Sequence, residues 1–255
     1  MRIANSIMIN SDLPVVYGPI FSRRLGRSLG INILPGREKT CSFDCVYCEC
    51  GRTATKTLFP QPETFPSSEQ ILVAIERTLK KPLTIDHVTF SGNGEPTLHP
   101  DFLKIAQETI ALVKKLKPSA KLALLTNSST YDKPDIYEAF QHFDKLFMKL
   151  DAADQDTFLK INQPTQDVNF EKIIDFLKSL PSITIQTAVF SGEPGNDSLS
   201  HIKRLVEVLA YINPGEVHFY TLDRPAWHPG IKRTGNLADL ILPLISGTGL
   251  RFQIF

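Results

Sequence analysis

The sequence predicts one α/β domain built on parallel strands, and three observations support this fold class. Short apolar segments typical of buried strands alternate with segments in which apolar residues recur at helical spacing. No linker or repeat boundary divides the 255 residues, a length that one large domain can fill. Polar and glycine-rich residues follow the strand-like segments, as the βα loops of a parallel sheet do. Periodicity alone leaves open whether the sheet closes, stays partly open or is doubly wound.

The expected elements follow in order along the chain. The strand-like segments are residues 28–34, 85–90, 121–125, 145–150, 183–190 and 216–222, with 251–255 as a further candidate. Helical segments lie within residues 67–80 and 99–118 and around 136–140, 170–180 and 199–212. Ser67 and Gln70 match the capping box that begins a helix. Pro118 marks the end of the second helix.

Composition excludes several classes of protein. The net charge is +1, and 42% of the residues are hydrophobic, so there is no overall attraction to nucleic acid or to a membrane. No apolar run reaches the roughly 18 residues of a membrane span. The first residues, MRIANSIMINSDLP, lack the sustained apolar core of a signal peptide. We therefore expect a cytoplasmic globular protein without membrane association.

All four cysteines lie between positions 41 and 50, in the segment CSFDCVYCEC. Such close spacing cannot make a disulfide framework, because a bridge would close only a tiny ring. In a reducing compartment clustered thiols more often bind metal or do redox work. Structural zinc usually takes four ligands, as does an electron-carrying [4Fe–4S] cluster. The spacing C-x3-C-x2-C of Cys41, Cys45 and Cys48 would leave one iron of such a cluster without a protein ligand.

This segment resembles the cluster motif of the radical S-adenosylmethionine (radical SAM) superfamily, including the aromatic Tyr47 before the last motif cysteine. The resemblance implies a [4Fe–4S] cluster on Cys41, Cys45 and Cys48 whose open iron is chelated by S-adenosylmethionine. Reductive cleavage of that cofactor would yield a 5′-deoxyadenosyl radical that abstracts hydrogen from a substrate. Cys50 receives no ligand role.

The resemblance also implies the fold and its boundaries. A parallel-stranded partial (β/α)6 barrel is expected as a single radical SAM core domain over residues 1–255. Within it, residues 1–27 would be an N-terminal extension, 28–222 the barrel core and 223–255 a C-terminal segment.

A second motif, SGNGEPTLHP at 91–100, follows the second predicted strand. It is similar to the superfamily's GGE or GEP motif, in which residues matching Gly94 and Glu95 hold the methionine amino group. Glycine lets a backbone approach a ligand closely, and a carboxylate accepts hydrogen bonds from an ammonium. Gly92 and Asn93 belong to the same expected cofactor turn. A tight strand-to-helix turn without a ligand is the alternative.

Four weaker matches extend the expected cofactor site. Asn127 lies in TNSS, where the superfamily often has a Thr-Asn-Gly turn. Asp151 follows the fourth strand and could bond a ribose hydroxyl, or serve as a helix cap or turn residue. Gln186 is an expected adenine or ribose contact. Lys149 is either a strand-end salt bridge or a contact to a substrate or cofactor carboxylate, and it is the one side chain considered for a catalytic role.

Longer segments, among them YGPIFSRRLGRSLGINILP, LDAADQDTFLKINQP and FYTLDRP, resemble the wyosine-synthase-like group of radical SAM oxidoreductases, related to tRNA imidazoG37 synthetase. That group carries a second cluster on three further cysteines, whereas this chain has only Cys50 left. The specific tRNA reaction is therefore doubtful, and a glycyl-radical activase also fits a one-cluster core.

Basic residues crowd the segment before the cysteines: Arg23, Arg24, Arg27, Arg37 and Lys39. They could attract RNA or a phosphate-bearing substrate, or be surface charges neutralised elsewhere. Trp227 is expected to pin a proline-rich loop onto the core, or to line the substrate mouth.

The leading hypothesis is therefore a radical SAM enzyme that takes electrons from an external flavodoxin-type or ferredoxin-type donor. The competing class is a non-catalytic Fe–S or zinc protein, either an electron carrier or a metal-dependent binding module. The sequence leaves the substrate (RNA, protein or small molecule), the oligomeric state and the role of Cys50 open.

Overall fold

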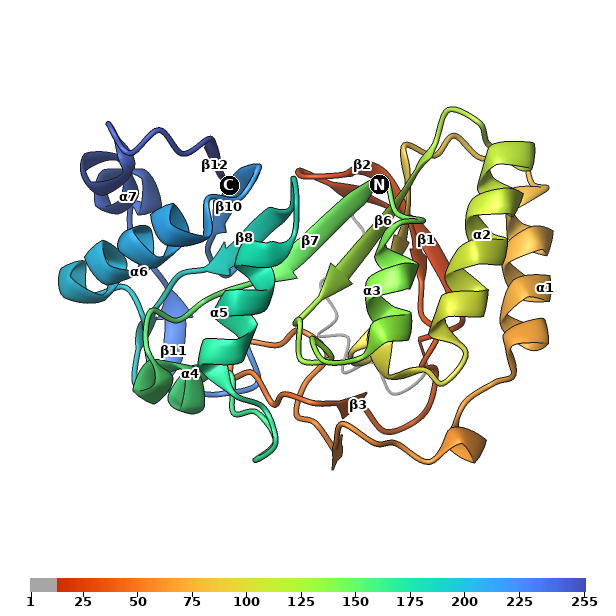
Figure 1. Cartoon of the computed structure of the whole chain (residues 1–255), viewed down its shortest axis with the longest axis horizontal. Coiled ribbons are helices and arrows are strands. Elements are labelled where there is room, and N and C mark those ends of the chain that lie inside the picture. The colour runs from red at the N-terminus through yellow and green to blue at the C-terminus, as the bar shows by residue number, and fades with distance from the viewer. Residues whose placement is uncertain (1–12) are drawn as a thin grey trace.

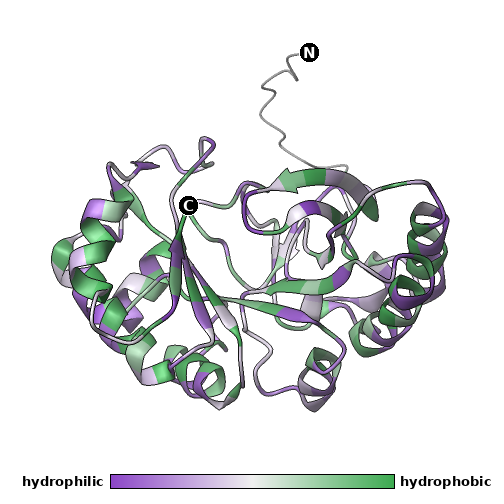
Figure 2. Cartoon of the chain, turned by 90° about the horizontal axis from the view of Figure 1, so that it is seen from above, coloured by the Kyte–Doolittle hydropathy of each residue, from purple (hydrophilic) through white to green (hydrophobic). Residues whose placement is uncertain are grey.

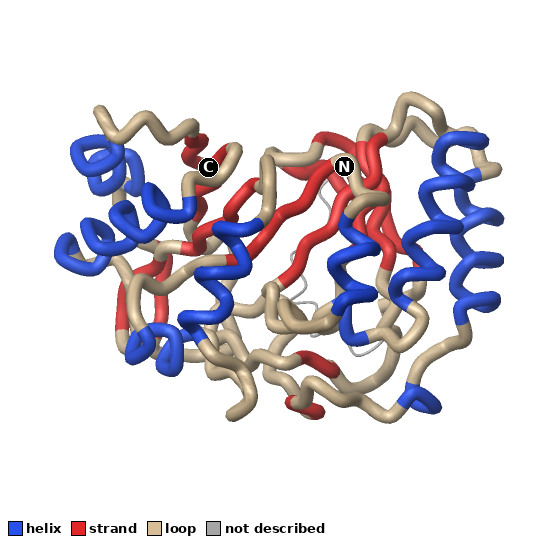
Figure 3. Tube along the Cα trace, in the orientation of Figure 1, coloured by secondary structure: helices blue, strands red, loops and turns tan. Residues whose placement is uncertain are grey.

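The computed structural model describes residues 13–255 as a curled, mostly parallel sheet with helices along its outer side (Figures 1 and 3). The strands of the main sheet, in order across it, are β1 (Val16–Ser22), β2 (Gly26–Ile31), β5 (His87–Phe90), β6 (Lys121–Thr126), β7 (Lys145–Lys149), β8 (Thr184–Ala188), β10 (Glu216–Tyr220) and β12 (Phe252–Ile254). All neighbours from β2 to β12 are parallel, and β1 runs antiparallel to β2. The predicted fold class, a partial barrel of parallel strands, is confirmed.

Residues 1–12 lie outside the described part of the chain. The prediction that the first residues lack the core of a signal peptide therefore stays a prediction. The same holds for the first part of the predicted N-terminal extension. The rest of that extension includes β1, which pairs with β2 in the main sheet. The predicted C-terminal segment likewise contributes β12, which pairs with β10.

The helices follow the strands and line the convex side of the sheet, as the view from above shows (Figure 2). They are α1 (Ser68–Leu79), α2 (Phe102–Leu116), α3 (Pro134–Phe140), α4 (Gln155–Ile161), α5 (Phe170–Ser179), α6 (Leu199–Ile212) and α7 (Leu237–Ile245). The predicted capping box of α1 is present: Ser67 accepts from the Gln70 amide, and the Gln70 side chain accepts from the Ser67 amide. The predicted helices are thus confirmed, while α4 and α7 were not predicted.

β1 was also missed, because its segment contains Gly18 and Pro19 and much of it is exposed at the sheet edge. Such a strand shows neither a continuous apolar run nor clean alternation.

The two faces of the sheet bury different sets of side chains. On β6, Leu122 and Leu124 belong to the main core between sheet and helices. Ala123, between them, belongs to a small separate cluster with Leu25 and Phe147. Because side chains alternate along a strand, this second cluster marks the opposite face of the sheet. We call it the concave face.

The loops after the strands gather at one edge, the lower one in Figure 1. Two small sheets reinforce them: β3 (Thr40–Cys41) pairs with β4 (Thr55–Lys56), and β9 (Phe190–Gly192) pairs with β11 (Ile231–Arg233). Two short 3-10 helices also lie in loops, η1 (Pro62–Thr64) and η2 (Pro96–Leu98). No helix in residues 13–255 is long and apolar enough to cross a membrane.

Candidate functional site

The cysteine loop begins at β3 and lies at this edge. All four cysteines are free thiols; Cys41 and Cys45 are buried and Cys48 and Cys50 half-buried. Side chains from distant segments donate to two of the sulfurs: Asn127 Nδ2 lies 3.7 Å from Cys41 Sγ, and Asn162 Nδ2 lies 3.5 Å from Cys45 Sγ. The structure thus surrounds these sulfurs with amide donors, which stabilise thiolate over thiol.

Lys39 places a cation beside the loop. Its side chain is buried and its Nζ donates to the Gly51 carbonyl oxygen at 3.0 Å. Burial alone would lower the pKa of Lys39, but the charges of Cys48, Cys41 and Cys45 outweigh it and raise that pKa. Buried cations are rare unless an anion faces them, so the loop is built to carry negative charge.

The thiols differ in acidity. Burial raises the pKa of Cys41 to about 12, against the opposing effect of Lys39. Burial also raises the pKa of Cys45. A hydrogen bond from Cys50 holds the pKa of Cys48 well below its usual range, and the same bond raises the pKa of Cys50. Cys48 is therefore the most easily ionised of these thiols.

The donor set fits a [4Fe–4S] cluster with three thiolate ligands. Three cysteines lie on one loop with amide donors and a buried cation around them, as an anionic sulfur centre requires. No group of three or more His, Cys, Asp or Glu side chains within residues 13–255 is arranged to hold a metal ion. A cluster spaces its ligands more widely than a single zinc ion, because each thiolate binds a different iron.

The GNGEP turn abuts the cysteine strand. Gly92 and Gly94 both have positive φ, at 138° and 132°. A Cβ added at Gly94 would lie 1.8 Å from the Thr40 carbonyl oxygen, and the two residues form an isolated parallel bridge. Only glycine fits at that approach. The Gly92 carbonyl oxygen also accepts from Cys50 Sγ at 3.2 Å, so both predicted motifs form one packed unit.

Glu95 is buried and ties this turn to the loop after β6. Its Oε1 accepts from Thr97, through both amide and hydroxyl, and from the Thr126 hydroxyl at 2.6 Å. Its Oε2 accepts from the Asn127 amide at 2.7 Å. Burial raises the pKa of Glu95, while these hydrogen bonds counter the rise. Since each carboxylate oxygen has about two acceptor positions, Oε2 keeps one for a further donor.

Asn93 has a structural role that its sequence position did not reveal. Its amide donates to Asn32 Oδ1 at 3.1 Å, and its Nδ2 donates to the Gly36 carbonyl oxygen at 3.1 Å. It therefore fastens the GNGEP turn to the segment that follows β2.

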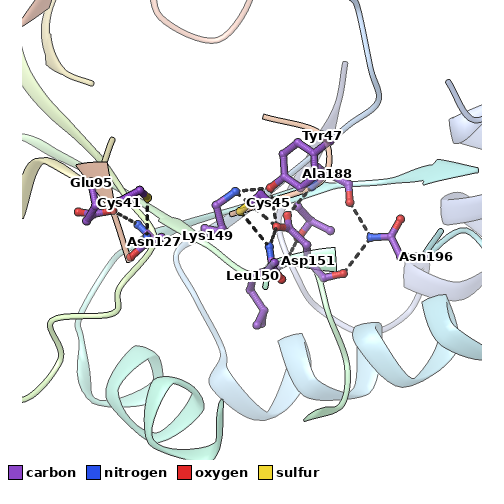
Figure 4. A network of polar contacts seen from close by, with 12 residues as sticks. Cys41, Cys45, Tyr47, Glu95, Asn127, Lys149, Leu150, Asp151, Ala188 and Asn196 are labelled. Carbon is purple, nitrogen blue, oxygen red and sulfur yellow. Dashed lines mark hydrogen bonds and ion pairs between the residues drawn. The ribbon is translucent and has the colours of Figure 1, made fainter. Parts of the chain in front are cut away.

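Asp151 is the centre of a second network (Figure 4). Its buried carboxylate accepts from the Tyr47 hydroxyl at 2.5 Å, from Asn162 Nδ2 at 2.9 Å and from the Ala188 amide at 2.9 Å. It caps no helix, since Asp154 caps α4. Oδ2 takes the Tyr47 and Asn162 donors and Oδ1 takes the Ala188 amide, so Asp151 joins the cysteine loop to the ends of β7 and β8.

Lys149 completes this network. Its Nζ lies 3.4 Å from Asp151 Oδ2 and hydrogen-bonds the Tyr47 hydroxyl. Burial would lower the pKa of Lys149, but Asp151 and the neighbouring thiols raise it. The salt bridge that was one of the two predicted roles of Lys149 is present, with Asp151 as its partner. Gln186 pairs in register with Lys149, lies on the concave face, and has no hydrogen-bond partner for its Nε2 among the described residues.

Part of the predicted basic patch is neutralised. Arg23 pairs with Asp223, and Arg27 pairs with Asp86. Trp227 pins its loop as expected, donating from Nε1 to the Cys45 carbonyl oxygen at 2.9 Å.

Sequence reasoning assigned no role to Asn162. It placed Lys39 in a basic patch that either attracts RNA or a phosphate-bearing substrate or is neutralised elsewhere. Asn162 stands in the INQP segment that contributed to the family resemblance, which was the available signal. For Lys39, the signal was its position two residues before the first cysteine.

Comparison with known proteins identifies the family. The model of the Radical SAM superfamily matches residues 39–209. A UPF0026 protein of Helicobacter pylori is 32% identical over 86% of this chain and 70% of its own length. A UPF0026 protein of Methanocaldococcus jannaschii is 34% identical over 86% of this chain and 67% of its own.

Solved structures share the fold. A radical SAM methyltransferase from Sphaerobacter thermophilus superposes with a TM-score of 0.63 at 14% identity, over 92% of this chain and 67% of that one. TYW1 with a lysine-pyruvate adduct bound gives 0.55 at 19% identity, over 86% and 71%. With the cysteine loop and the GNGEP turn packed at one sheet edge, these matches show that the chain belongs to the Radical SAM superfamily, with the UPF0026 proteins among its relatives.

Proposed function

We propose that this chain is an enzyme that uses one [4Fe–4S] cluster, held by Cys41, Cys45 and Cys48, to cleave S-adenosylmethionine reductively. Together, cluster and cofactor would supply a 5′-deoxyadenosyl radical for hydrogen abstraction from a substrate. The observation that carries the proposal is the direct packing of the Gly94 backbone on Thr40, next to the first cysteine. An electron carrier has no use for a cofactor-amine turn at that place.

Two asparagine side chains link the parts of the proposed site. Asn127 contacts both the GNGEP turn and the cysteine loop, because its backbone amide donates to Glu95 and its side chain donates to Cys41. It can therefore hold the cofactor turn and the first thiolate at a fixed separation. Asn162 likewise links Cys45 to Asp151. These bridges preorganise the two halves of the site before a ligand arrives.

The cofactor would be held along the same edge. Glu95 Oε2 would take the methionine ammonium, with the backbone of Gly92, Asn93 and Gly94 beside it. Tyr47, Asn127, Asp151 and Gln186 are the further contacts proposed from the resemblance. Since Asp151 is engaged with Tyr47 and Asn162, it would act on the cofactor chiefly by positioning these neighbours.

Membership of the wyosine-synthase-like group remains part of the proposal, without its second cluster, since Cys50 is the one cysteine left over. A cytoplasmic setting and an external flavodoxin-type or ferredoxin-type donor complete it. The pairing of Arg23 and Arg27 with carboxylates leaves less free charge for RNA than the sequence suggested.

The test is anaerobic reconstitution with iron and sulfide, followed by reduction in the presence of S-adenosylmethionine. We expect 5′-deoxyadenosine from the wild-type chain, and its loss together with the cluster in Cys41→Ala, Cys45→Ala and Cys48→Ala. Cys50→Ala is the matched control and should retain the cluster. Uptake of one equivalent of zinc without a cluster would refute the proposal, and loss of the cluster in Cys50→Ala would refute the ligand assignment.

A further inference from the structure

Three side chains on or beside the concave face have buried polar atoms that no described residue satisfies. They are Arg24 Nη1, Gln186 Nε2 and His218 Nδ1. The exposed fraction of Gln186 is 8% and that of His218 is 4%. Buried polar atoms are nearly always hydrogen-bonded, so an unpaired set in one place needs a partner from outside the described chain.

The three side chains lie close together. Gln186 and His218 are direct partners in the β8–β10 ladder, and neighbouring strands are about 4.8 Å apart. Arg24 comes from the turn between β1 and β2, and its guanidinium lies 4.5 Å from the centre of the Tyr220 ring. Tyr220 follows His218 by two residues on β10 and so shares its face. The three unpaired atoms therefore lie in one region of the concave face.

The hydrogen-bond chemistry of His218 is set by its neighbours. Its Nε2 lies 3.1 Å from Glu216 Oε2. Burial lowers the pKa of His218, and the pKa of Glu216 is also lowered through hydrogen bonds from Gln253 and His218 that outweigh its burial. A neutral imidazole that donates from Nε2 to a carboxylate keeps Nδ1 as an acceptor. The ring is held between Phe147 and Phe255, at centroid distances of 5.7 and 5.1 Å.

Charges around this place favour an anion. The groups that face His218 are the carboxylate of Glu216 and the cations of Arg24 and Lys145. Glu216 is engaged by His218 and Gln253, and Lys149 by Asp151. Arg24 has no hydrogen bond or ion pair from its guanidinium to any residue in 13–255, in contrast to its neighbour Arg23, which pairs with Asp223.

We infer that Arg24 and His218 form the anchor of a substrate site for a small anion that carries both acceptor oxygens and a hydroxyl or amine, such as a hydroxy-carboxylate or a phosphate monoester. The Arg24 guanidinium donates to the anionic oxygens, and His218 Nδ1 accepts from the hydroxyl or amine. Gln186 lies between His218 and Lys149 in register, at the boundary between this anchor and the proposed cofactor site. The inference rests on the proposed function, because it identifies the anion as the molecule that the radical would attack.

The depth of the site excludes a nucleic-acid backbone as the occupant. Nucleic-acid contacts come from exposed cations along a surface, whereas His218 and Gln186 are almost completely buried. The exposed arginines next to Arg24 are already paired.

The test is a ligand-observed NMR titration of the oxidised, cluster-loaded protein with S-adenosylmethionine bound, so that the open iron is occupied, and without reductant. The probes are glycolate, its neutral analogue glycolamide, and inorganic phosphate. We expect saturable binding of glycolate, phosphate or both, and none of glycolamide; the stronger anion identifies a carboxylate or a phosphate as the natural group. Arg24→Gln should weaken the anion about tenfold or more, Arg24→Lys less, and the matched control Arg23→Gln less than about twofold.

Equal binding of glycolate and glycolamide would overturn the inference, as would absence of anion binding to the wild-type protein. Full retention of anion binding in Arg24→Gln would do the same. A short RNA hairpin could also displace glycolate from the wild-type protein and fail to do so equally in Arg23→Gln. That outcome would overturn the inference and identify RNA, not a small anion, as the occupant. Because the titration needs no cofactor cleavage, its result is independent of whether 5′-deoxyadenosine forms.

Discussion

Replacing Gly94 by alanine tests how closely the GNGEP turn and the cysteine strand depend on one another. The new Cβ would lie 1.8 Å from the Thr40 carbonyl oxygen, so either the turn or the strand must move. Gly51 is the matched control, because it also has positive φ, at 79°, but an added Cβ meets nothing within 4 Å. Both variants carry the backbone strain of alanine at positive φ, and only Gly94→Ala adds an overlap with the Thr40 carbonyl oxygen.

The magnitudes follow from these geometries. Alanine at Gly51 should cost about 1–2 kcal/mol of unfolding free energy, the strain of left-handed backbone. Alanine at Gly94 should cost that strain and about 1–3 kcal/mol more from forced overpacking. In urea unfolding of the cluster-free protein under anaerobic reducing conditions, a difference of that size moves the midpoint by roughly 0.3–1 M at an m-value of about 3 kcal/mol/M.

The same two variants should also differ in the amount of iron that the cysteine loop binds. Gly94→Ala displaces Thr40 and with it Cys41, so it should bind less iron per chain on reconstitution, while Gly51→Ala should load normally. If the two variants unfold within about 0.5 kcal/mol of each other and load equal iron, the turn does not constrain the cysteine strand as the structure indicates.

Three further predictions concern single side chains. Lys39→Met should lower the midpoint potential of the reconstituted cluster, because a buried cation favours the more negative reduced state. The expected shift is on the order of 60 mV, which corresponds to a tenfold change in the ratio of reduced to oxidised cluster. An EPR-monitored redox titration that finds no shift would contradict this. Tyr47→Phe should lower the unfolding free energy by about 1–3 kcal/mol, because it removes a donor to the buried carboxylate of Asp151; an unchanged urea midpoint would speak against that network. The pKa of Asp86 is lowered to about 2 by hydrogen bonds from Arg27, so this pair stabilises the fold above pH 3.8 and loses its effect as pH falls toward 2. Asp86→Asn should therefore flatten the acid-unfolding curve in that window, and a curve parallel to wild type would show that the pair contributes nothing.

The sequence predicted the local features well because they depend on neighbouring residues. The capping box at Ser67, the end of α2 before Pro118 and the strand character of β6 each follow from a few consecutive side chains. The positions of the cysteine loop and the GNGEP turn at one edge follow from parallel topology. β1 escaped prediction, since an exposed edge strand needs little apolar pattern.

Partners that come together only through the fold could not be predicted. Tyr47 and Asp151 are 104 positions apart, and Trp227 meets Cys45 over 182. No spacing rule connects such residues. For the same reason the sequence left open whether the basic segment attracts RNA or a phosphate-bearing substrate or is neutralised elsewhere, because Arg23 meets its carboxylate partner, Asp223, only 200 positions later. The burial of Lys39 beside the cysteines was likewise not predicted, because burial depends on the whole assembled edge.

The amide donors to the cysteine sulfurs have a consequence for the order in which the site matures. Asn127 lies 86 positions after Cys41, and Asn162 lies 117 positions after Cys45. At a synthesis rate of roughly 5–20 residues per second, Asn162 leaves the ribosome roughly 6–23 s after Cys45. Throughout that interval the nascent chain exposes bare thiols without the amides that stabilise their charge. Iron and sulfide supplied after release would instead meet a completed edge, so the chain is better suited to loading after synthesis than during it.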